Sequence, residues 1–160
     1  MHYLVDAYNI IFQYFDEHSL SLEGKRELLI RLCEELINKK NIKITLIFDG
    51  NQVHALWTKH TKSPNLEIAF SEHNQTADQY ILEELSSLKR TNNVIVITSD
   101  NRLSLQCRQR HVKTKTSSSF LKLLLKKHVP VTNDKPQFKE SELQIQRLEQ
   151  IFTKKIQDND

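Results

Sequence analysis

Residues 94–101 read VIVITSDN, a run of β-branched apolar residues followed closely by an aspartate. The same order recurs in LVDAYN (4–9) and ITLIFDG (44–50), and another apolar run, LEIAF (66–70), precedes the aspartate of QTADQ (75–79). Short runs of this kind are typical of strands buried in a parallel sheet. Because the carboxyl ends of such strands meet at one crevice, we expect the aspartates to lie together. They are Asp6, Asp49, Asp78 and Asp100.

Strand-like and helix-like segments alternate along most of the chain. The expected strands are 3–6, 43–48, 66–70, 94–98 and 112–115. The expected helices are about 20–39, 52–60, 77–89, 102–110, 118–127 and 140–156. This alternation predicts an α/β fold in which helices cover both faces of a central parallel sheet. Thr76 is the expected N-cap of the helix that carries Asp78, and the serines at 117–119 are the expected caps of the helix at 118–127.

The C-terminal part is set off by the loop VPVTNDKPQF (129–138), which contains two prolines. We expect residues 1–130 to form one domain, and residues 131–160 to be a linker followed by an extra helix. Four apolar residues of that helix are spaced to form one face. They are Ile145, Leu148, Phe152 and Ile156. This face is expected to dock on the same domain; contact with a partner chain is the alternative, and the oligomeric state is left open.

The net charge of +3 hides a basic segment. Residues 102–128 carry eight lysines and arginines and no acidic side chain, directly after the last of the four aspartates. Such a segment next to an acidic centre favours a nucleic acid backbone as partner, with a solvated helix face as the alternative. The residues expected to bind it are Arg102, Arg108, Arg110, Lys113 and Lys115. The aromatic residues Tyr8, Trp57 and Phe120 are expected to pack inside the protein rather than on bases.

Several classes of protein are disfavoured. No stretch approaches the roughly 20 apolar residues that a membrane span needs, and the first strand begins too early for a signal peptide. Cys33 and Cys107 form no CxxC pair, which indicates reduced thiols and a cytoplasmic protein. Gly24 and Gly50 are the only glycines, which excludes glycine-rich nucleotide-binding loops. Tyr8 stands where one class of aspartyl-phosphate phosphatase has a second aspartate.

Four aspartates at one edge of a sheet indicate a cation site. Like charges packed together are unfavourable unless a cation neutralises them, and carboxylate oxygens suit Mg²⁺ or Mn²⁺. Such an ion can lower the pKa of bound water and stabilise the charge of a phosphodiester. An acidic site beside a basic segment is therefore suited to the hydrolysis of nucleic acid. For any single aspartate, capping of the following helix is the alternative.

Four segments together resemble a known family. LVDAYNII, LIFDG, NQTADQYI and ITSDN occur in the order and at the spacing of NYN-domain nucleases, and are most similar to the YacP-like group, relatives of the PIN domain. The resemblance covers residues 1 to about 127. It implies a PIN-like three-layer α/β/α fold and hydrolysis of RNA, single-stranded mRNA or rRNA, with one or two Mg²⁺ or Mn²⁺ ions. The ribosome is a candidate partner.

The resemblance also implies roles for single residues. Asp6 and Asp100 resemble direct metal ligands, and Asp78 a ligand or a residue that supports one. Asp49 would hold a metal-bound water or complete the acidic ring, and Asn9 would position Asp6 or a phosphate.

The remaining residues of these segments would support the ligands. Ser99 and Asn101 flank Asp100 in the sequence and would form hydrogen bonds with the groups that surround this ligand. Gln79 departs from the family, whose third segment usually reads TADE; a neutral amide lowers the charge of the site, for which Glu72 or Glu83 could compensate. This departure supports the alternative function, a non-catalytic RNA-binding or ribosome-associated module with a weakened metal site.

Overall fold

The fold is one parallel sheet between two layers of helices. The structure is a computed structural model that describes residues 1–15, 20–50, 63–72 and 74–125. The strands are β1 (His2–Asp6), β2 (Lys43–Phe48), β3 (Leu66–Phe70), β4 (Val94–Ile97) and β5 (Lys113–Lys115). The helices are α1 (Ala7–Tyr14), α2 (Leu22–Lys39), α3 (Ala77–Ser87), α4 (Asn101–Gln109) and α5 (Ser117–Leu125).

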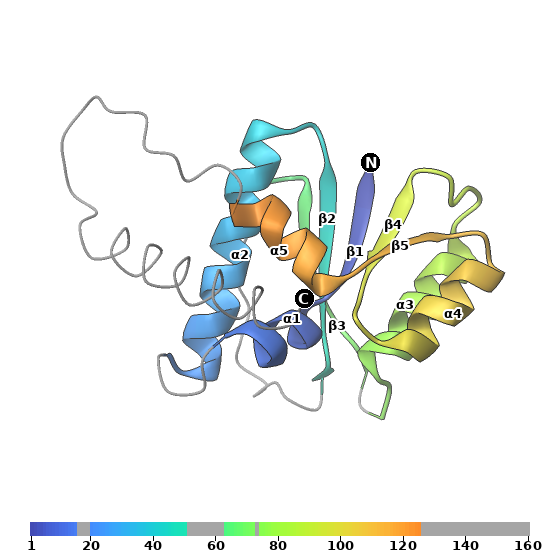
Figure 1. Ribbon diagram of the computed structural model, residues 1–160, viewed down its shortest axis with the longest axis horizontal. Coiled ribbons are helices and arrows are strands. Elements are labelled where there is room, and N and C mark those ends of the chain that lie inside the picture. The colour runs from blue at the N-terminus through green and yellow to red at the C-terminus, as the bar shows by residue number, and fades with distance from the viewer. Residues whose placement is uncertain (16–19, 51–62, 73, 126–160) are drawn as a thin grey trace.

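Every strand pair in the described sheet is parallel, and the strand order is β3-β2-β1-β4-β5. Figure 1 shows α1, α2 and α5 on one face of the sheet and α3 and α4 on the other. This arrangement confirms the predicted three-layer α/β/α fold with a central parallel sheet. Among the described residues, no helix is both long and apolar enough to cross a membrane.

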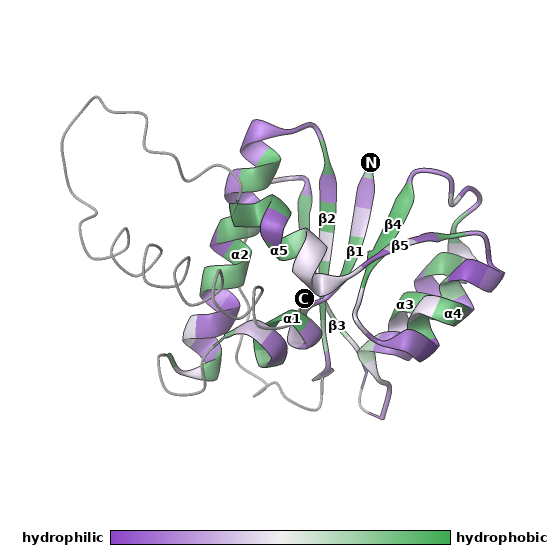
Figure 2. Ribbon diagram, viewed as in Figure 1, coloured by the Kyte–Doolittle hydropathy of each residue, from purple (hydrophilic) through white to green (hydrophobic). Residues whose placement is uncertain are grey.

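Alternate side chains of the central strands enter two separate cores. Tyr3 and Val5 of β1 pack with α1, α2 and α5, whereas Leu4 between them packs with α3 and α4. The neighbouring strand β4 divides its apolar side chains in the same way. Figure 2 shows the consequence: β4 is hydrophobic along its length, while the edge strand β5 is hydrophilic. The period of two in a strand explains why these runs contain almost no polar residue.

The observed elements agree with the expected ones to within a few residues, with two exceptions. Helix α1 was not expected, because the apolar residues after Asp6 continue the pattern of the strand. The cap of α5 is Thr116, whose Oγ1 accepts a hydrogen bond from the Ser119 amide at 3.2 Å, so the expected serine cap was wrong. The expected helices at 52–60 and 140–156, and the linker from 131, lie outside the described residues.

The strand order places a topological switch point between β1 and β4. The chain proceeds from β1 outward to β2 and β3, and then returns to the other side of β1 to form β4. The connections after β1 and β4 therefore leave the sheet toward opposite faces and open a crevice between them. Asp6 ends β1, and Asp100 follows β4 by three residues, so both lie at this crevice.

A candidate acidic active site at the carboxyl edge of the sheet

Each of the four predicted aspartates follows or ends a different strand of the sheet. Asp6 is paired with Ile47 in the register of β1 and β2, so Asp49 follows only two residues beyond that level. Asp78 lies in the first turn of α3, which packs against β1 and β2. Asp100 caps α4. The sheet therefore brings all four to its carboxyl edge, as the sequence predicted.

The pKa of Asp6 shows that these carboxylates affect one another. Asp6 is buried, with 9% of its surface exposed, and its pKa is raised from 3.8 to about 6. Burial is the largest cause, and the negative charges of Asp78, Asp100 and Asp49 raise the pKa further. The hydrogen bond from the Asn9 amide opposes them but does not prevail. Asp6 thus sits in an excess of negative charge.

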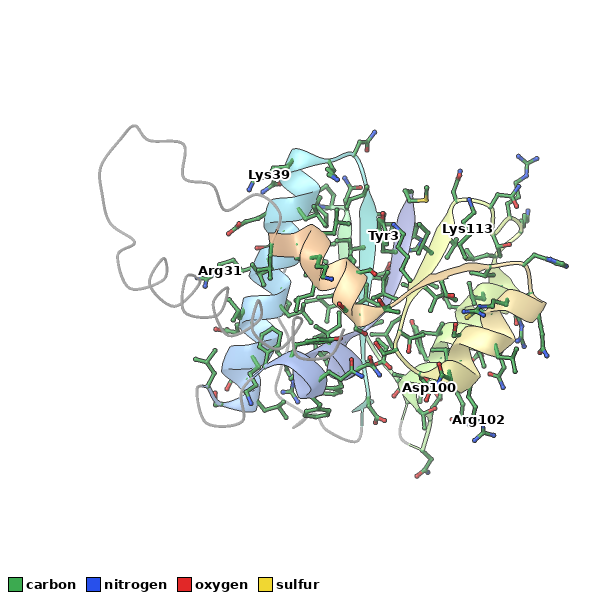
Figure 3. The ribbon with its side chains drawn as sticks, in the orientation of Figure 1. Tyr3, Arg31, Lys39, Asp100, Arg102 and Lys113 are labelled. Atoms are coloured by element: carbon green, nitrogen blue, oxygen red, sulfur yellow. The ribbon has the colours of Figure 1, made fainter. Side chains whose placement is uncertain are left out.

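Asp78 is in a similar but more exposed position. Burial and the charge of Asp100 raise its pKa, whereas the nearby guanidinium of Arg102 lowers it. Arg102 lies at the start of α4, next to Asp100 on the same edge (Figure 3). It is therefore a basic residue placed where a phosphate on the acidic site would meet it.

Two of the aspartates are held by helix starts through one oxygen each. Oδ1 of Asp6 accepts a hydrogen bond from the Asn9 amide at 3.1 Å, and Oδ1 of Asp100 accepts one from the Leu103 amide at 2.8 Å. Among the described residues, Oδ2 of neither aspartate accepts a hydrogen bond. Capping therefore fixes both carboxylates and leaves one oxygen of each for a ligand.

Asn9 joins the two halves of the crevice. Its side-chain Oδ1 accepts hydrogen bonds from the Ser99 amide at 3.2 Å and from the Ser117 hydroxyl at 2.7 Å. The Ser117 amide in turn donates to Ser99 Oγ at 3.2 Å. We call Asn9, Ser99 and Ser117 the bracket. It ties the first turn of α1, directly after Asp6, to the segment before Asp100. The positioning roles that the resemblance implied for Asn9 and Ser99 stay predictions.

Ser117 is expected to stabilise this bracket. Its side chain is fully buried, so Ser117→Ala removes the shortest hydrogen bond of the three and should cost about 1–2 kcal/mol of unfolding free energy. Urea denaturation followed by circular dichroism measures this cost. Ser118→Ala is the matched control, since Ser118 is half-buried on the same helix, its side chain has no hydrogen bond within the described residues, and its loss should change stability by less than about 0.5 kcal/mol. Equal values for the two variants would contradict the bracket.

A second set of contacts holds the turn that carries Asp49. The amide of Gly50 donates to Ser71 Oγ at 2.9 Å, and that hydroxyl donates to the Gln75 carbonyl at 2.7 Å. The amide of Ser71 donates to the Phe48 carbonyl at 3.0 Å. Ser71 therefore links the end of β2 to the segment that leads into α3, and so Asp49 to Asp78.

Gln79 has a structural task in this site. Its side-chain oxygen accepts a hydrogen bond from the backbone amide of Thr76 at 2.9 Å, and the backbone amide of Gln79 donates to Thr76 Oγ1 at 3.2 Å. These two bonds form a capping box, which confirms Thr76 as the N-cap of α3. Asn101, the first residue of α4, is exposed beside Asp100.

The predicted basic residues do not gather at the acidic edge. All five are exposed. Helix α4 begins at the acidic edge and runs away from it, so Arg108 and Arg110 lie at the end of α4 that is remote from Asp100. Lys113 is paired with Ile95, in register with Tyr3 near the start of β1, and Figure 3 shows it toward the opposite end of the sheet from Asp100. Only Arg102 is tied to the acidic residues by a described electrostatic effect.

The family of YacP-like NYN domains matches residues 3–159. The chain belongs to this family. It is therefore a nuclease-like domain of the PIN-like class, as the four segments predicted.

Two solved structures share the fold of this YacP-like domain. The structure of Rae1 (YacP) from Bacillus subtilis is 23% identical, with a TM-score of 0.66 over 99% of this chain and 83% of that chain. A mutant of the same protein is 24% identical, with a TM-score of 0.62 over 77% of this chain and 74% of that chain. No curated protein matches the chain.

The oxygen donors of the YacP-like domain fit a hard divalent cation. Within the ranges that the structure describes, no group of three His, Cys, Asp or Glu side chains forms a metal cage on its own. Mg²⁺ does not need one, because it keeps several waters and takes one or two carboxylates. The two carboxylate oxygens left by the caps of α1 and α4 suit such an ion, and its charge would offset the crowding around Asp6.

Proposed function

We propose that this YacP-like domain is a metal-dependent endoribonuclease whose Mg²⁺ or Mn²⁺ would be held by Asp6 and Asp100, with Asp78 as a further ligand or as the support of one. The observation that supports this most is the raised pKa of Asp6, caused by burial and by three neighbouring carboxylates. A protein gains nothing in stability from such crowding. The crowding is understandable if a cation completes the site.

The residues of the chain supply position and charge. An ion bound there would supply a lowered pKa for an attacking water and positive charge for the phosphodiester. Asp6 and Asp100 are fixed by their caps and by the bracket, so their free oxygens need little reorganisation. Asp49 completes the acidic ring from the β2 side, and Arg102 would bind a phosphate of the RNA near Asp78. The products would carry a 5′-phosphate and a 3′-hydroxyl.

RNA as the substrate rests on the family, and a single-stranded mRNA or rRNA is the substrate class we propose. A cytoplasmic location and contact with the ribosome belong to the same proposal. The other four exposed basic residues, Arg108, Arg110, Lys113 and Lys115, would bind the RNA backbone away from the scissile bond.

The alternative, a non-catalytic RNA-binding module, depended on Gln79. A capping box has glutamine or glutamate at this position. Here the side-chain oxygen of Gln79 accepts from the Thr76 amide, and the backbone amide of Gln79 donates to Thr76 Oγ1. Helix capping therefore explains the residue, and its neutral charge gives no separate support for a weakened centre.

The test is cleavage of labelled single-stranded RNA by the purified protein. We expect cleavage with Mn²⁺ or Mg²⁺, none with EDTA, and a loss of about 100-fold or more in Asp100→Asn. Glu35→Gln is the matched control, because it removes the same charge at a distance from the acidic site. Glu35 lies near the C-terminal end of α2, and Figure 3 shows Lys39, the last residue of α2, at the opposite edge of the sheet from Asp100. Binding without cleavage in all conditions would favour the non-catalytic module. Cleavage that persists in EDTA would exclude the metal mechanism.

A further inference from the structure

An exposed aromatic ring lies on α1, close to the acidic site. Phe12 has 62% of its surface exposed, the largest value among the large hydrophobic side chains of the described residues. Single exposed apolar side chains are common and need no explanation by themselves. Phe12 differs in how its ring is held and in where it lies.

The ring of Phe12 is the outer end of a series of packed aromatic rings. It stacks almost parallel on Tyr8, with 5.1 Å between centroids and an interplanar angle of 8°. Tyr8 meets Phe48 edge to face at 5.3 Å, and Phe48 packs against Phe70 at 5.7 Å. Phe48 is fully buried. The series thus runs from the core to the surface.

Tyr8 is itself fixed from the side. Its hydroxyl accepts a hydrogen bond from Nε of the buried Arg26 at 2.8 Å, and the Arg26 guanidinium lies 5.3 Å from the Tyr8 ring centroid. One face of the Phe12 ring therefore packs on the Tyr8 ring, which Arg26 and Phe48 hold in place. In the described part of the chain, the other face has no aromatic partner.

The position of Phe12 places this open face beside the proposed catalytic residues. Helix α1 begins directly after Asp6, so the backbone of Phe12 lies about 9 Å along the helix axis from the backbone of Asp6, at 1.5 Å per residue. Figure 1 shows α1 at the end of the sheet where the strands β1 and β2 finish. A polymer whose backbone crosses the acidic edge would therefore bring a neighbouring unit over Phe12.

An unpaired nucleic acid base fits this ring better than a protein does. A base presents a flat π face, and stacking on an aromatic side chain is the usual way of binding single strands. A protein interface needs a contiguous apolar patch. The other large exposed apolar side chains of the described residues, Met1 and Leu105, lie at the start of the chain and on α4, so no such patch surrounds Phe12.

We propose that Phe12 is a stacking platform for one unpaired base of the RNA, next to the phosphodiester held at the acidic edge. This inference rests on the proposed function insofar as RNA is the ligand. It adds a selection for single strands, because a paired base is already stacked within its duplex and cannot lie on the ring without being unpaired.

The test measures binding apart from cleavage. In the Asp100→Asn background with Mg²⁺, fluorescence polarisation of labelled single-stranded RNA should show binding weakened about 5- to 100-fold by Phe12→Ala. Phe12→Trp should restore it. Leu105→Ala, which removes a comparably exposed apolar side chain from α4, should change it by less than about twofold. The melting temperatures of these variants should agree, since Phe12 is exposed.

A scan of RNAs with one abasic position identifies the base. At one position the abasic RNA should bind the Phe12 protein more weakly, and the same change should have no effect on Phe12→Ala. The platform would be overturned if the proteins with Phe12 and with Phe12→Ala bind RNA equally well. It would also be overturned if, at every abasic position, the loss of affinity is the same in both proteins. If the protein with Asp100 cleaves RNA in that case, the nuclease proposal stands. If binding depends on Phe12 but no RNA is cleaved, the stacking platform stands and the nuclease proposal fails.

Discussion

Asp6→Asn is expected to lower metal-dependent RNA cleavage by about 100- to 1000-fold and, in the absence of metal, to make the folded protein more stable. The loss of activity follows from the loss of a charged ligand, since an amide oxygen binds a hard cation more weakly and does not offset its charge. The gain in stability follows from the electrostatics of the free site, in which burial and three carboxylates oppose the ionisation of Asp6.

The sign of the pH dependence is determined by the raised pKa. Because the pKa of Asp6 in the folded protein is about 6 rather than 3.8, the folded state binds the proton more tightly than the unfolded state does. The stability contributed in this way is fully present below about pH 3.8 and is lost as the pH rises through about 6. At pH 7.5 the ionised carboxylate should cost roughly 2–3 kcal/mol. Asp6→Asn removes that cost and keeps the cap of α1, since asparagine caps as well as aspartate.

Urea denaturation in EDTA between pH 4 and pH 8 measures this difference. Asp6→Asn should be the more stable protein at pH 7.5, and the two should converge toward pH 4. Asp6→Ala separates charge from capping, because it also removes the charge but should lose about 1 kcal/mol relative to Asp6→Asn. Added Mg²⁺ should stabilise the unsubstituted protein and leave Asp6→Asn unchanged. A variant that is less stable at pH 7.5, or that cleaves RNA normally, would contradict the acidic site.

The strands and the aspartates that end them could be predicted from sequence because both are local. A strand buried on both faces must be apolar at nearly every position, as in Val94–Ile97. Parallel strands share one carboxyl edge, so residues such as Asp6 and Asp100 meet although 94 positions separate them in the sequence. The family resemblance rests on the same residues, which is why fold and acidic edge were predicted together.

The parts that could not be predicted depend on contacts between distant segments. The bond between Asn9 and Ser117 joins residues 108 positions apart, and no local pattern in a single sequence connects them. Helix α1 was hidden because Ile10 and Ile11 prolong the apolar run of β1. Phe12 was missed with it. The basic segment was continuous in sequence, but α4 turns back from the edge, so its charges are spread along the protein.

Gly50→Ala is expected to destabilise the protein by about 2–4 kcal/mol and to reduce cleavage as well. A Cβ at this position would lie against the backbone carbonyl oxygen of Ser71, well inside van der Waals contact. That oxygen belongs to the main chain and cannot turn away as a side chain can. The two segments would have to separate, which would weaken the bond from the Gly50 amide to Ser71 Oγ and displace Asp49. The reason is space and not a left-handed backbone, since Gly50 has no positive φ.

Gly24→Ala is the matched control, because the sequence has only these two glycines. A Cβ on Gly24 would meet its nearest neighbour, Ser21 Oγ, at 3.4 Å, an ordinary contact. Gly24 lies in the first turn of α2, where alanine favours the helix, so Gly24→Ala should stabilise the protein by about 0.5–1 kcal/mol. The same substitution should thus have opposite signs at the two positions in thermal denaturation. A Gly50→Ala protein as stable as the Gly24→Ala protein would mean that Ser71 does not hold the Asp49 turn in place. The β2 side of the acidic edge would then lack the rigidity on which its part in the site depends.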